Sequence, residues 1–128
     1  MIKISLLLIS IFSLLYGLVF SFAPYFFAEL TQAETTNIAW LRNIGASICG
    51  VLFVGLLFVY RSPSKNYDLF MIITITSILQ TLGLIFSRFY NEFSAQNTLI
   101  IDFTIYSAVF VSLYLAYILL NYKSIFNK

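Results

Sequence analysis

The chain has 128 residues, with 7 Lys or Arg, 5 Asp or Glu and no His, and its formal net charge is +2. Only 9% of the residues are charged and 61% are hydrophobic, whereas roughly a quarter of the residues in a soluble domain are charged. Most of the outer surface must therefore face lipid rather than water. We predict an integral membrane protein.

Composition also excludes several classes of function. The positive charges are spread along the chain without a basic run, so we expect no binding to nucleic acid. Without histidine, and with Cys49 as the single cysteine, the chain offers no His-ligated haem or metal site and no internal disulfide. We expect neither a cofactor nor a metal.

The first apolar stretch runs from about residue 4 to residue 22 and stops before Pro24. Lys3 precedes it, as a basic residue precedes the apolar region of a signal peptide. The stretch is longer than such a region, and Pro24 directly follows the position where cleavage would occur. We interpret it as a retained helix.

Three further apolar stretches follow, and each is close to the ~20 residues that cross a ~30 Å hydrocarbon layer. They cover about residues 38–60, 69–89 and 99–120, and Arg61-Ser62-Pro63-Ser64 ends the first of these. Short polar gaps between them make neighbouring helices antiparallel. The sequence predicts an all-α protein, a single domain built as an integral membrane four-helix antiparallel bundle.

The distribution of Lys and Arg predicts the orientation, because cytoplasmic loops carry an excess of both. With the N-terminus inside, five positive residues lie on the cytoplasmic side and two, Arg42 and Arg88, lie at the other end. The five are Lys3, Arg61, Lys65, Lys123 and Lys128. Both termini are therefore expected in the cytoplasm, and in a bacterium the protein belongs to the inner membrane.

Two similar segments raise the question of an internal repeat. Residues 17–21 (Gly-Leu-Val-Phe-Ser) end the first span, and residues 83–87 (Gly-Leu-Ile-Phe-Ser) end the third. Duplication of a hairpin would give a parallel repeat with its axis along the membrane normal. In a chain so rich in Leu, Ile and Phe, five matching residues also arise by chance.

Ionisable residues within the spans cluster at one end, the outer end in the predicted orientation. Arg42 lies about one turn into the second span, Asp102 about one turn into the fourth, and Arg88 in the last turn of the third. Such groups are costly in a membrane and mark either function or a specific pairing. The cluster is either a pocket for a polar or anionic group, or an interhelical ion pair with the second guanidinium reaching the interface.

Other polar side chains extend this candidate site. Gln80 lies near the middle of the third span, where its amide needs a partner on another helix or lines the floor of a cavity. Tyr106 lies one turn after Asp102 on the fourth span. On the third span, one predicted face carries Thr76, Gln80, Gly83 and Ser87.

Small residues on the second span predict a packing surface, either within the bundle or between subunits. Gly45, Ala46, Cys49, Gly50 and Gly55 have spacings that allow helix backbones to approach closely. Cys49 is then a small apolar residue rather than a nucleophile, since no histidine is present to activate it.

The segment from Gly17 to Gly55 combines a Gly-Leu-Val-Phe helix end, an aromatic exit with Pro24, and Trp-Leu-Arg-Asn-Ile-Gly over residues 40–45. It resembles the uncharacterised four-helix membrane proteins of the DUF4345 type, which are similar in architecture to DoxX-like proteins. The resemblance matches Arg42 and Gly45 to an Arg-x-x-Gly start of the second helix. Arg88 and Asp102 correspond to an arginine ending the third helix and an acid early in the fourth. It implies the fold, whereas an activity does not follow from a shared fold.

We therefore expect a non-catalytic accessory subunit or a binder of a lipid, quinone or other small amphiphile, acting through the polar cluster near the outer face. Its expected partners are the lipid bilayer and another membrane protein or a second copy. A small-molecule transporter that uses Asp102 for proton coupling is one alternative. A membrane enzyme acting on a lipid or quinone, with Tyr106 or Asp102 as the proton carrier, is the other.

Overall fold

Four helices are long and apolar enough to cross a membrane. The computed structural model describes residues 2–32, 38–93, 96 and 98–126, and within these ranges it contains helices and no strand. The four long helices are Ile2–Phe22 (α1), Ile38–Arg61, Tyr67–Phe89 (α5) and Thr98–Leu120 (α6). Each end lies within two residues of its predicted boundary. The all-helical prediction is confirmed, and the four helices support a multi-pass membrane protein.

The helix Ile38–Arg61 is not a regular α-helix throughout. It begins as α3 (Ile38–Ser47), widens into the π-helical segment η2 (Ile48–Val54) and ends as α4 (Gly55–Arg61). The buried hydroxyl of Ser10 on α1 donates to the Phe53 carbonyl of η2 at 2.9 Å. A side chain of the neighbouring helix thus hydrogen-bonds the backbone of the irregular segment. Nothing in the apolar sequence of this span predicts the widening.

Short helices lie in the gaps between the predicted spans and after the fourth span. Helix α2 (Pro24–Thr31) starts with proline at a first-turn position, which suits proline because its missing N–H would have no partner there. It stops where Gln32 adopts a left-handed conformation, with φ of 51°. At the opposite end of the molecule lie η3 (Pro63–Lys65) and α7 (Tyr122–Phe126).

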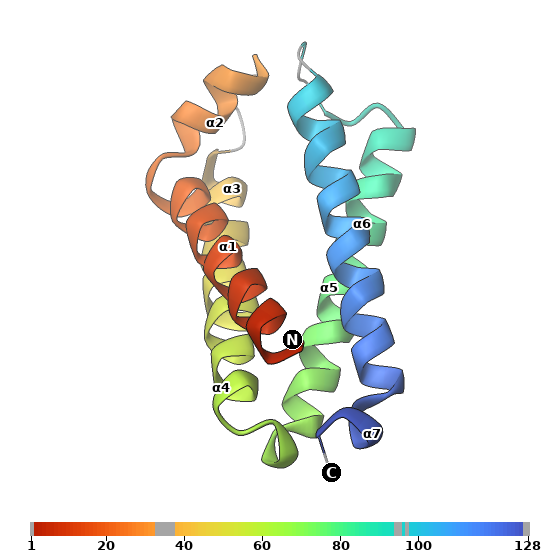
Figure 1. Cartoon of the computed structure of the whole chain (residues 1–128). Coiled ribbons are helices and arrows are strands. Elements are labelled where there is room, and N and C mark those ends of the chain that lie inside the picture. Colours follow the sequence, from red (N-terminus) through yellow and green to blue (C-terminus); the bar gives the residue numbers. More distant parts are fainter. Residues whose placement is uncertain (1, 33–37, 94–95, 97, 127–128) are drawn as a thin grey trace.

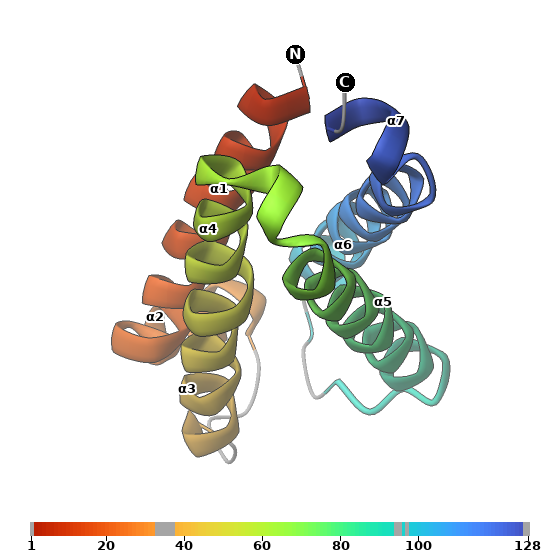
Figure 2. The same ribbon diagram turned by 90° about the horizontal axis from the view of Figure 1, so that it is seen from below.

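The helices form two hairpins, and Figure 2 shows α1 beside the α3–η2–α4 span and α5 beside α6. The first hairpin is held by close backbone approach where Gly17 faces Gly45. A Cβ on Gly45 would lie 2.8 Å from the Gly17 carbonyl oxygen, and one on Gly17 would clash with the Cys49 sulfur. Without a hydrophobic drive between helices in lipid, this close contact is a main source of association.

The same contact distinguishes the two segments that resemble a repeat. Gly17 is buried against the second span, whereas Gly83 is exposed, and a Cβ added there would meet no described atom within 4 Å. The matching residues therefore have different surroundings.

A buried apolar core joins the two hairpins at one end of the molecule. All four spans and α7 contribute to it, and the residues are Leu6, Leu56, Val59, Phe70, Ile73, Leu115, Ile118 and Tyr122. Tyr122 also donates its hydroxyl hydrogen to the Pro63 carbonyl at 2.5 Å. This end carries both chain termini, while the hairpin ribbons part toward the other end (Figure 1). We refer to these as the terminal end and the distal end.

Buried hydroxyl groups hold the second hairpin together. Ser112 on α6 lies 2.8 Å from both Ser77 and Thr81 on α5, and Thr81 donates to the Ala108 carbonyl at 3.3 Å. Interhelical hydrogen bonds of this kind stabilise helix pairs in lipid, where water offers no competing partner. The polar face of α5 that packs on α6 is therefore Ser77–Thr81, not the predicted face with Thr76 and Gly83, of which Gly83 is exposed.

The Gly17–Gly45 contact predicts that an added methyl group destabilises the protein at Gly45 but not at Gly50. In Gly45→Ala the new Cβ would lie 2.7 Å from the Ser21 backbone nitrogen, which cannot move without separating the helices. We expect a loss of about 1–3 kcal/mol in the free energy of unfolding. Titration with SDS, followed by circular dichroism, measures it. Gly50→Ala is the control, since its Cβ would meet no described atom within 4 Å, and equal losses in both variants would contradict the contact.

Candidate functional site

Arg88 and Asp102 meet near the distal end of the second hairpin. The Arg88 Nε donates to Asp102 Oδ1 at 2.7 Å, and Nη2 donates to Oδ2 at 3.3 Å. The last turn of α5 supplies the guanidinium, and the second turn of α6 supplies the carboxylate. This bidentate geometry fixes the relative rotation of the two helices as well as neutralising both charges. Both side chains remain about one-third exposed, at 38% and 34%.

Arg42 belongs to the first hairpin instead. It lies on α3, is exposed, and donates from Nη1 to the Ser21 carbonyl of α1 at 3.1 Å. Its described contact caps the end of α1, where carbonyl groups lack helical partners. The three charged residues predicted to form one cluster are thus engaged in two separate interactions, one in each hairpin.

Neither Gln80 nor Tyr106 forms a described hydrogen bond with these charged residues, although Tyr106 lies close enough to Arg88 to interact with it electrostatically. Tyr106 on α6 is 74% exposed, so its ring lies on the outer surface of the helices rather than in a pocket. Gln80 on α5 is half-buried, and its amide has no hydrogen-bond partner among the described residues. Within the described residues, Gln80 therefore does not form the interhelical hydrogen bond that the sequence favours.

A different contact links the hairpins in their distal halves. The Tyr16 hydroxyl of α1 and the Thr104 hydroxyl of α6 lie 2.8 Å apart. The Gln96 backbone N–H also reaches the Gln32 carbonyl after α2, at 3.5 Å. Sequence reasoning passed over both, because a tyrosine or threonine in an apolar span carries no signal of its partner.

Next to the Tyr16–Thr104 contact lies an apolar pocket, which we call the distal pocket. Its volume is about 230 Å³, and α1, α2 and α6 all contribute to its wall. The lining residues are Leu15, Tyr16, Val19, Phe20, Phe27, Leu30 and Ile100. The rings of Phe20 and Phe27 pack edge to face, with centroids 4.7 Å apart, and connect α1 to α2. Short helix α2 thus adds a wall to a pocket that remains open to the outside.

The described groups of this region are an apolar pocket and one ion pair. The distal pocket is lined by carbon, apart from a Tyr16 hydroxyl that Thr104 already engages. Asp102, the carboxylate of α6, is paired with Arg88. Among the described residues, no group of three or more Cys, Asp and Glu lies close enough to hold a metal ion.

Comparisons with protein-family models, with curated proteins and with solved structures found no match to this chain. The resemblance to DUF4345-type and DoxX-like proteins therefore stays a prediction.

The two charged interactions predict a specific pattern of energetic coupling. Arg88→Gln and Asp102→Asn each remove the same ion pair, so their combined loss of stability should be smaller than the sum of the single losses. Arg42→Gln and Asp102→Asn touch separate contacts, and their losses should add. Unfolding in SDS of the single and double variants measures both cycles. Coupling between Arg42 and Asp102 as strong as that of the Arg88 pair would restore the single cluster and contradict the arrangement described above.

Proposed function

We propose that this protein is a non-catalytic membrane protein, an accessory subunit or binder, that holds a lipid, quinone or other small amphiphile near its distal end. The observation that carries the proposal is the distal pocket. A void of about 230 Å³ lined by apolar side chains holds part of a hydrocarbon or isoprenoid chain without desolvating any polar group.

The charged residues near the distal end supply a polar neighbourhood for the head of such a molecule. Arg42 is exposed and uses one guanidinium nitrogen on Ser21, so it retains donors for an anionic or carbonyl oxygen. Arg88 and Asp102 together present a neutral, hydrogen-bonding pair that remains partly accessible. Arg42 and the Arg88–Asp102 pair thus offer two separate polar contacts at the same end of the molecule, and none of the three residues lines the distal pocket.

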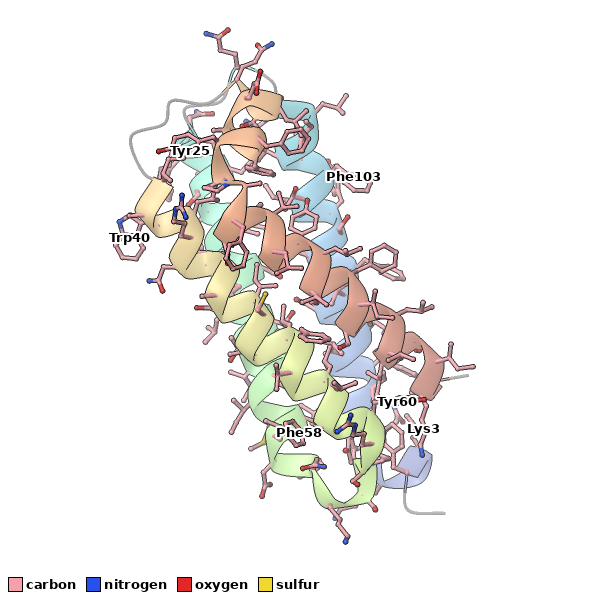
Figure 3. The ribbon with its side chains drawn as sticks, turned by 90° about the vertical axis from the view of Figure 1, so that its left-hand side faces the viewer. Lys3, Tyr25, Trp40, Phe58, Tyr60 and Phe103 are labelled. Carbon is pink, nitrogen blue, oxygen red and sulfur yellow. The ribbon has the colours of Figure 1, made fainter. Side chains whose placement is uncertain are left out.

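The distribution of charges supports an orientation with both termini in the cytoplasm. Lys3 and Tyr60 lie toward one end of the molecule and Trp40 and Tyr25 toward the other (Figure 3). The basic residues of the terminal end favour the cytoplasm by the positive-inside rule. In a bacterium, the distal end would then face the periplasm across the inner membrane.

The transporter and enzyme alternatives receive less support from the geometry. Proton coupling needs a carboxylate that takes up and releases protons, whereas both carboxylate oxygens of Asp102 accept hydrogen bonds from Arg88. Tyr106, the other candidate proton carrier, lies on the surface rather than beside the distal pocket.

Cysteine labelling tests the orientation. In a Cys49→Ala background, Asn91→Cys places a thiol in the loop after α5, and Ser64→Cys places one in η3. A membrane-impermeant maleimide added to intact cells should label position 91 and leave position 64 unlabelled until the membrane is opened. The reverse pattern would invert the proposed topology.

Mass spectrometry of the gently solubilised protein tests the binding. We expect an amphiphile to co-purify and to be reduced about tenfold in Val19→Trp, whose indole fills the distal pocket, since filling it removes more than 1 kcal/mol of apolar contact. Leu18→Trp is the matched control, because Leu18 is exposed on the neighbouring position of α1 and does not line the pocket. If nothing co-purifies, or if both variants lose it equally, the pocket is not the binding site.

A further inference from the structure

A second pocket lies at the terminal end, where α6 passes into α7, and we call it the terminal groove. Its volume is about 370 Å³. Tyr67 at the start of α5 forms one wall, and the turn from α6 into α7 forms the rest. The lining residues are Tyr67, Leu119, Leu120, Asn121, Tyr122, Lys123 and Ser124.

An aromatic pair and two hydrogen-bonded polar side chains line the groove. Tyr122 is buried, and its ring packs edge to face on Tyr67, with centroids 5.2 Å apart. Asn121 and Ser124 donate their side-chain hydrogens to backbone carbonyls of the same turn, at 2.9 and 2.8 Å. These bonds fix the shape of the groove, and neither of them involves a charged side chain.

Lys123 supplies that charge. It is exposed, and its ammonium has no hydrogen-bond or ion-pair partner among the described residues. Other positive residues of the terminal end include Lys3, Arg61 and Lys65, while Asp68 is the acidic residue next to the groove wall. Among the residues that line the groove, Lys123 is the charged one, so the lining itself is positive and favours an anion.

Leu120 identifies the kind of anion. It ends the fourth span, lines the groove and is 87% exposed, so an apolar surface continues from the groove into the hydrocarbon layer. A free anion would gain nothing from this surface, whereas a phospholipid places its phosphate at the level of span ends and its acyl chains along the span. We propose that the terminal groove binds the phosphate group of an anionic glycerophospholipid, with Lys123 as the cationic contact.

This inference does not depend on the distal pocket or on the orientation of the chain in the membrane. The test uses purified protein in mild detergent with an equimolar mixture of phosphatidylglycerol and phosphatidylcholine that carry the same acyl chains. Native mass spectrometry measures how much of each lipid stays bound. We expect about fivefold preference for phosphatidylglycerol, the effect of roughly one lysine contact near a membrane surface.

Lys123→Gln should remove this preference, while Lys65→Gln, which makes the same charge change outside the groove, should retain it. Excess inorganic phosphate should not displace the lipid. Equal binding of both lipids, equal effects of the two variants, or displacement by phosphate would each overturn the proposal.

Discussion

Close backbone contact between α1 and the second span is the constraint on which the first hairpin depends. Helices in lipid gain nothing by hiding apolar surface from one another, so their association needs close packing or hydrogen bonds. Gly17 and Gly45 provide the packing, and the Ser10 hydroxyl adds a bond to the π-helical segment. The second hairpin uses the other means, through Ser77, Thr81 and Ser112. Two hairpins thus reach stability by two different routes.

The two hairpins contact each other differently at the terminal end and at the distal end. At the terminal end, Leu6, Leu56, Phe70 and Leu115 meet in one fully buried core. Toward the distal end, the described contacts between the hairpins include the hydroxyl contact of Tyr16 with Thr104 and the packing of α2 on α6. The apolar distal pocket lies beside these contacts, and spaces between helices are where proteins commonly bind small molecules.

Hydropathy alone was sufficient to predict the four spans and their boundaries, because each span must match the thickness of a bilayer. It also placed Arg88 and Asp102 at the same depth, and they do pair. Depth along a helix, however, does not give rotation about its axis. Arg42 therefore lies at the expected level but bonds Ser21, and Tyr106 lies one turn from Asp102 but faces outward.

Of the remaining features, one could have been predicted from the sequence and two could not. Helix α2 was readable in principle, since Pro24 followed by helix-forming residues is typical of a helix start. The π-helical segment was not, because its apolar residues carry no signal of it and the hydroxyl that bonds its backbone, Ser10, lies on another helix. The choice of Ser77 and Thr81 over Thr76 and Gln80 depends on where Ser112 lies, which no single helix encodes.

Burial of Tyr122 has a consequence for the acid–base behaviour of the terminal end. Removal of its phenol from water raises its pKa from 10.0 to about 12. The neutral hydroxyl, which donates to Pro63, is therefore retained at every pH that a cell experiences. A raised pKa favours the protonated, folded state, so this contribution is complete below about pH 10 and disappears as the pH rises through 12. The hydrogen bond that attaches α7 to η3 between the hairpins is therefore retained under neutral and mildly alkaline conditions.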